Sequence, residues 1–242
     1  GKRERRGHYV PNAILKIAPL YPPRFREVMA WLPSYFLPWN VIFAASAVLY
    51  WMLFIPPIET MQTLAPGWIL QLYLVNVIAV ALFYGAIELR LYVTRAQDDR
   101  FKFNPRFPSE VKSRQFWFRS QNVENILRTF LSGVTIWTLS AVVMLWLYAN
   151  TWGNWLNLGE APVYLALVAL MVSFIHQAHF YAIHRLIHLP WLYKHVHSIH
   201  HTSVNPAPWS ALAMHPAEHV LYFASVFYHV ILPSHPMIAL YQ

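Results

Sequence analysis

Histidine is concentrated in one part of this 242-residue chain. Thirteen histidines occur, and twelve of them lie between residues 176 and 235. The densest part holds two motifs, His184-x-x-x-His188 and His197-x-x-His200-His201. On a helix, residues four apart share a face and residues three apart lie close to it. Each motif is therefore expected to direct its imidazoles the same way, and a short loop through Pro190 and Lys194 could bring the second motif over the first.

Imidazole is a ligand for zinc, copper, iron and nickel. Five histidines in two tight motifs exceed the four ligands of a usual zinc site, which favours two metal ions. The chain has no Cys, so thiolate sites and disulfides are excluded. It also lacks the Glu-x-x-His repeat of soluble carboxylate di-iron bundles. Iron is favoured because an open, histidine-rich iron site can activate dioxygen, which would explain a metal beside lipid.

Histidines near or within a membrane span can also serve as ordinary polar side chains or as haem ligands. A lone histidine on a span is usually a polar side chain with a hydrogen-bond partner, and we prefer this role for each of five: His176, His179, His195, His229 and His235. Haem ligation needs only one or two histidines in facing helices. A packed His-x-x-His-His motif suits haem poorly.

The composition indicates a membrane environment for the elements that position these residues. Hydrophobic residues make up 57% of the chain and charged residues only 12%, about half the charged fraction of a soluble domain. The formal net charge is +8. The basic residues lie in hydrophilic segments between apolar runs, which is typical of positive charge retained on the cytoplasmic side. Nucleic-acid binding is not predicted.

Four apolar runs are long enough to cross a hydrocarbon core, which needs about 20 helical residues: 40–58, 67–89, 126–149 and 161–183. A fifth run, 211–232, contains His215, Glu218, His219 and His229, and charged groups are costly in lipid. It could be a span lining a cavity, a re-entrant pair of half-helices or an interfacial helix. The predicted fold is an all-α, polytopic membrane helix bundle with about four to five apolar spans and a cytoplasmic-side histidine cluster.

The distribution of Lys and Arg predicts the topology. The basic N-terminus and the basic segment 90–125 fall on one side of two helical hairpins, and residues 184–205 fall on that same side. The turn 151–160, which has no Lys or Arg, falls on the other. We expect an integral membrane protein with its N-terminus and histidine cluster in the cytoplasm. The predicted regions are a cytoplasmic or interfacial lead-in (1–39), N-terminal transmembrane helices (40–150) and a histidine-bearing domain (151–242).

At these motifs the sequence resembles the fatty acid hydroxylase / sterol desaturase superfamily of membrane di-iron oxygenases. The superfamily's first two histidine boxes match the two motifs above. Two further stretches also look like the family: Asn205-Pro206-Ala207-Pro208 and His215-Pro216-Ala217-Glu218. The resemblance covers about residues 160–242.

The resemblance implies an O2-dependent enzyme that hydroxylates or desaturates a lipid or sterol-like substrate taken from the bilayer. It implies two non-haem iron ions and an external electron donor on the cytoplasmic side. It assigns metal binding to His184, His188, His197, His200 and His201, with His215 as a ligand or a neighbour of one, and with His179 and His219 as weaker candidates. Arg185 and Glu218 are expected to form structural pairs near the site. The basic segment 90–125 is expected to be a solvated surface at the lipid headgroups, and docking of an acidic electron donor there is an alternative.

One departure from the family pattern affects the functional prediction. The family carries a third box, usually another His-x-x-His-His, and this sequence reaches Gln242 without it. We favour a polypeptide that continues, so that the domain 151–242 lacks its C-terminal part here. The alternative is a non-catalytic membrane subunit that retains the oxygenase fold and binds a larger complex, in which His215 and His219 would have to complete any metal shell. A haem-binding electron-transfer subunit is a third possibility. The substrate, and the choice between hydroxylation and desaturation, are not predicted.

Overall fold

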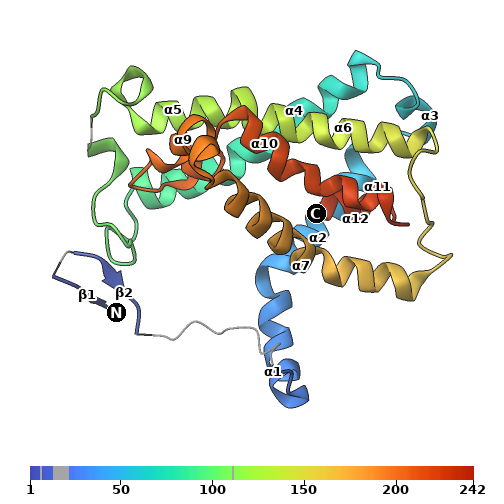
Figure 1. Ribbon diagram of the computed structural model, residues 1–242, viewed down its shortest axis with the longest axis horizontal. Coiled ribbons are helices and arrows are strands. Elements are labelled where there is room, and N and C mark those ends of the chain that lie inside the picture. Colours follow the sequence, from blue (N-terminus) through green and yellow to red (C-terminus); the bar gives the residue numbers. More distant parts are fainter. Residues whose placement is uncertain (6, 13–21, 111) are drawn as a thin grey trace.

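The computed structural model describes residues 1–5, 7–12, 22–110 and 112–242, and the fold of these residues is nearly all-α (Figure 1). Part of the predicted lead-in 1–39, residues 6 and 13–21, lies outside the described chain. Four helical stretches in the described residues are long and apolar enough to cross a membrane: Phe25–Phe54, Pro66–Val93, Gln121–Ala149 and Pro162–Ile187. The predicted all-α membrane bundle is confirmed, with four spans.

Three of the four stretches are built from shorter elements. The first combines α1 (Phe25–Tyr35), η1 (Phe36–Asn40) and α2 (Val41–Phe54). The second combines α4 (Pro66–Glu88) and η2 (Leu89–Val93), preceded by the single turn α3 (Ile58–Met61). The third combines α5 (Gln121–Arg128), η5 (Thr129–Val134) and α6 (Thr135–Ala149). The fourth is the continuous helix α7 (Pro162–Ile187).

The first stretch differs from its prediction. The predicted run began at residue 40, close to the start of α2, but a separate helix, α1, precedes it. The two meet at Leu37, whose extended backbone (φ −102°, ψ 139°) interrupts the helix. Pro38 explains this kink, because a residue before proline is driven out of the helical region. With 14 residues, α2 is about 21 Å long, shorter than the hydrocarbon core of about 30 Å. The first stretch is therefore long enough to cross the hydrocarbon core only when α1 is included. The helix α1 projects from the bundle, and none of its side chains is buried (Figure 1).

The fifth apolar run does not form a continuous span. The chain instead forms a series of short helices: η7 (Pro208–Leu212), α10 (Pro216–Phe223), η8 (Ala224–Phe227), α11 (Tyr228–Ile231) and α12 (Pro236–Tyr241). The longest, α10, has 8 residues and is about 12 Å long. Its polar residues Glu218 and His219 are buried in protein, with 0% exposure. Burial in protein thus keeps these polar groups away from lipid, where they would be costly.

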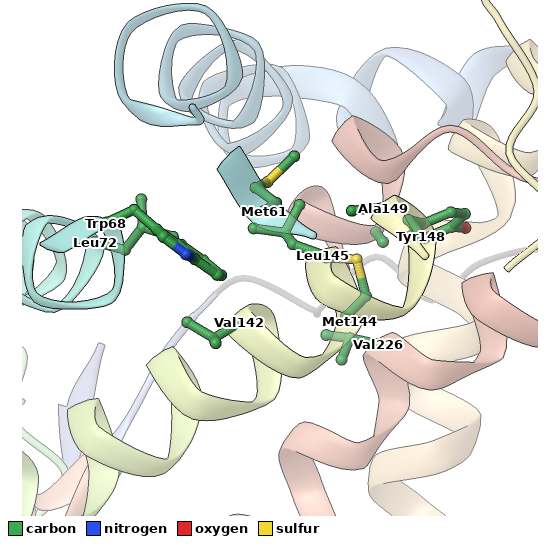
Figure 2. Close-up of a cluster of buried hydrophobic side chains, with 10 residues drawn as sticks. Met61, Trp68, Leu72, Val142, Met144, Leu145, Tyr148, Ala149 and Val226 are labelled. Atoms are coloured by element: carbon green, nitrogen blue, oxygen red, sulfur yellow. The ribbon is translucent and has the colours of Figure 1, made fainter. Parts of the chain in front are cut away.

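The core lies around α6, the last part of the third span. Its buried side chains pack against α4 on one side and against the C-terminal helices on the other. Figure 2 shows this cluster: Met61, Trp68, Leu72, Val142, Met144, Leu145, Tyr148, Ala149 and Val226. The same third span contacts α10. The core therefore fixes the position of α10 within the bundle.

Replacing the core residue Leu145 by Ala should destabilise the protein strongly. The Leu145 side chain is fully buried in the cluster, and loss of a buried leucine typically costs about 2 to 5 kcal/mol because a cavity remains. The control is Leu139→Ala on the same helix, where the side chain is 49% exposed and faces outward. Thermal unfolding in detergent should show a large fall in Tm for the first variant and little change for the second. Equal shifts would contradict the assigned core.

The basic segment 90–125 begins in η2 and ends in α5. The described residues between these helices form a loop with two short turns, η3 (Pro108–Glu110) and η4 (Trp117–Arg119). Its charges are partly paired: Arg95 lies 2.7 Å from Glu110, and Arg3 lies 3.1 Å from Asp99. Arg3 follows Lys2 in β1 (Lys2–Arg3), which pairs antiparallel with β2 (Tyr9–Val10). The N-terminal hairpin thus covers part of this segment.

Candidate metal centre

The C-terminal end of α7 carries the first motif. His184 lies in the last turn of the helix and His188 caps it. Their Nε2 atoms are 3.2 Å apart, as expected for residues one helical turn apart on the same face. Pro190 then begins the next turn, α8 (Pro190–Leu192), because proline is well tolerated at the first helical position.

The second motif lies on two turns that continue from α8: η6 (Tyr193–His197) and α9 (Ser198–His201). This return brings the second motif onto the first. The ligand atoms of His184, His188 and His197 all lie within 4.8 Å of one another. The Nε2 atoms of His197 and His201 are 3.0 Å apart, and the rings of His188 and His201 are 5.4 Å apart. Four imidazoles from two motifs thus converge.

The spacing of these nitrogens fits shared coordination of a metal ion. Two nitrogens each about 2.1 Å from one ion lie about 3.0 to 3.4 Å apart when the angle between the bonds is about 90° to 110°. The 3.0 and 3.2 Å separations fall in this interval. An all-imidazole donor set suits iron or zinc.

The electrostatics also favour metal binding. Burial, reinforced by the neighbouring imidazoles, lowers the pKa of His197 to about 3. Burial is the main cause that lowers the pKa values of His200 and His201. These rings are therefore uncharged at neutral pH, and an uncharged imidazole has the free lone pair that a metal requires.

The other ring nitrogens of two cluster histidines contact α10. His184 Nδ1 lies 3.1 Å from the Tyr222 hydroxyl. His197 Nδ1 lies 2.8 Å from Glu218 Oε1, and both of these side chains are completely buried. Burial raises the pKa of Glu218 to about 8. Since both nitrogens are Nδ1, the Nε2 atoms of the same rings are left to face the centre of the cluster.

The remaining sequence-predicted residues lie around this cluster rather than in it. His200 stacks beside His197, with 5.7 Å between ring centroids. The structure gives its buried Nδ1 no hydrogen-bond partner among the described residues. His215 Nδ1 accepts from the Ala217 amide at the start of α10, and His219 Nε2 lies 3.1 Å from the Leu212 carbonyl. Both nitrogens of His179 are engaged, by Tyr228 and by the Leu221 carbonyl.

The histidines interpreted as ordinary polar side chains have contacts of their own. His176 meets the Gln242 carbonyl, His195 the Trp191 carbonyl and His229 the Ser234 hydroxyl, while His235 accepts from the Met237 amide. Arg185 contacts Tyr181 through an exposed hydrogen bond.

Sequence reasoning missed Tyr222 and the specific partner of Glu218. The sequence did contain a signal for these two residues: positions 218 and 222 are four apart and therefore share a face of α10. Which histidine each would meet depends on packing between segments 21 and 38 residues apart.

The part of the chain that carries the candidate site is similar to known proteins. Residues 169–241 match the family model described as fatty acid hydroxylase. A Delta(7)-sterol 5(6)-desaturase of Gibberella zeae is 40% identical over 74 residues, 31% of this chain and 22% of that protein. Another, of Aspergillus fumigatus, is 26% identical over 144 residues, 55% of this chain and 41% of that protein. Fatty acid hydroxylase domain-containing protein 2 of Macaca fascicularis is 32% identical over 97 residues, 39% of this chain and 29% of that protein.

These matches confirm the resemblance to the fatty acid hydroxylase / sterol desaturase superfamily. The matched region covers less than half the length of each of these three relatives. No solved structure matches the chain. With the four apolar spans, the family supports the prediction of an integral membrane protein.

Proposed function

We propose, from the fatty acid hydroxylase domain at residues 169–241, that this chain is part of a membrane oxidoreductase that hydroxylates or desaturates a lipid with dioxygen. The observation that carries the proposal is the convergence of the two histidine motifs at the end of α7. His184, His188, His197 and His201 would hold an iron ion there. Bound iron would supply the oxidising power that an unactivated C–H bond requires.

A second iron ion is part of the proposal, and it rests mainly on the family resemblance. His200 has a buried, unpartnered ring nitrogen beside the cluster and is the strongest candidate ligand. His215 and His219 would each have to exchange a present hydrogen bond for a metal bond. The four converging imidazoles support the first ion more directly than any described residues support the second.

The position of the cluster supports a substrate from the bilayer. It lies at the end of an apolar helix of 26 residues, where the hydrocarbon core meets water. Apolar side chains near it remain exposed, including Phe180, Leu186 and Tyr193. A sterol or a fatty acyl chain could reach the cluster along such a surface, and the named relatives that act on Delta(7)-sterols favour a sterol.

The electron donor would act from the side of the membrane that the cluster faces. The distribution of Lys and Arg favours the cytoplasm for this side. If each of the four candidate spans in the described residues crosses the membrane, residues 22–24 and the cluster would lie on the same side. The partly paired basic segment 90–125 remains a candidate docking surface for an acidic donor.

Metal and lipid analysis tests the proposal. The full polypeptide, purified in detergent, should contain iron and show no haem Soret band. Lipid mass spectrometry of cells with and without the gene should reveal one lipid that loses two hydrogens or gains one oxygen only when the gene is present. A Soret band would indicate a haem-binding electron-transfer subunit. A protein without metal and without any lipid change would indicate a non-catalytic membrane subunit.

A further inference from the structure

One face of α10 touches both histidine motifs. Glu218 contacts His197 of the second motif, and Tyr222, four residues later, contacts His184 of the first. Residues four apart lie one above the other on a helix. A single short helix therefore reaches the two ligands that come from different segments of the chain.

The position of α10 is itself well determined. It packs against α6 and α7, and the His215 side chain caps its first turn. Phe180 of α7 stacks on Tyr222 at 5.0 Å and on His184 at 5.5 Å, with interplanar angles of 18° in both cases. These stacks hold the Tyr222 hydroxyl and the His184 ring in a fixed relation.

Glu218 has an environment that ordinary structural pairing does not explain. Its carboxyl group is fully buried, and its hydrogen-bond partner among the described residues is the uncharged His197 ring rather than a Lys or Arg. Its second oxygen has no hydrogen-bond partner in the described chain. Burial of a carboxylate without a basic partner is costly. A metal ion on the far side of the His197 ring would supply the missing positive charge.

We propose that α10 is the positioning element of the metal centre, with Glu218 and Tyr222 orienting His197 and His184 through their Nδ1 atoms so that both Nε2 atoms face the same point. The inference rests on the proposed function, since it requires that the cluster bind metal. When Nε2 binds the ion, Nδ1 carries the proton and donates to the Glu218 carboxylate or to the Tyr222 oxygen. A carboxylate makes the ligand imidazole a stronger donor than a phenol does, so Glu218 has the larger effect.

The test uses cobalt(II) added to the metal-free full polypeptide in detergent, with affinity and the visible ligand-field spectrum as readouts. Loss of such a partner typically reduces metal affinity about 10- to 100-fold. The Glu218→Ala variant should lose cobalt affinity by a factor in the upper part of this range, and its ligand-field spectrum should change. Glu218→Gln, which retains the shape and a hydrogen bond but not the charge, should lose about tenfold. Tyr222→Phe should lose less than either Glu218 variant.

The matched control is Val220→Ala, on the same helix with a side chain 54% exposed. It should bind cobalt as the unmodified protein does. If Glu218→Ala does not fold, Glu218→Gln decides, with its thermal unfolding measured alongside. Unchanged affinity and spectrum in a folded Glu218→Gln variant would overturn the inference while leaving the proposed function intact. Failure of the unmodified protein to bind either cobalt or iron would overturn both.

Discussion

Replacing His197 by Ala should remove metal from the protein and abolish lipid oxidation. His197 lies at the centre of the cluster, with ring centroids 4.9 Å from His184, 4.8 Å from His188 and 4.6 Å from His201. It is also the ring that Glu218 contacts. Its loss removes a ligand and separates the second motif from the buried carboxylate. Metal content per polypeptide and product formation should both fall to background.

The matched control is His195→Ala, two residues earlier. The His195 ring is exposed, lies tilted beside the Trp191 ring and is 2.8 Å from that residue's carbonyl oxygen, so it lies outside the group of converging imidazoles. This variant should retain iron and turnover close to the unmodified protein. If the His197 variant kept its metal, or if both variants lost it equally, the assigned centre would be wrong.

Removal of metal by a chelator should loosen residues 193–201 while leaving the core intact. This segment consists of two short turns, which have little stability of their own because short helices are marginal in water. A metal ion would cross-link them to α7. A ligand present at about a thousand times its Kd stabilises the folded state by about 4 kcal/mol, so its removal should be readily detected.

Hydrogen exchange measured by mass spectrometry can detect the loosening of residues 193–201 separately from changes elsewhere in the chain. After chelation, amides of 193–201 should exchange faster, whereas amides of α6 should remain protected by the core cluster. The His197→Ala variant is the control, since it has no metal to lose and should not respond to the chelator. Identical exchange of the unmodified protein with and without chelator would rule out a structural role for the metal.

Local periodicity predicted much of this structure. The i, i+4 spacing correctly paired His184 with His188 and His197 with His201, because each pair lies within one or two turns of chain. Apolar length correctly indicated four spans. Both inferences depend on properties of single elements, which sequence patterns report directly.

Contacts between distant segments were not predictable in the same way. Hydropathy marked 211–232 as one apolar run, yet the burial of Glu218 and His219 by neighbouring helices made short helices the stable form. The roles of Glu218 and Tyr222 depend on how α10 packs beside α7. His200 shares its motif with His197 and His201, yet it stacks behind His197, since a residue three positions on is rotated about 60° from the shared face.

During synthesis, Met61 and Trp68 emerge from the ribosome long before Val226 and Ala239, although these four side chains pack in one buried cluster. The helix α4 therefore enters the membrane with its future contact face still unpaired, and it must wait for α6 and the last short helices before the core can close. Because α10 belongs to that late group, the histidine motifs also reach their final geometry only after these helices have emerged. During this interval, the unfinished chain should be most exposed to the proteases that clear misassembled membrane proteins.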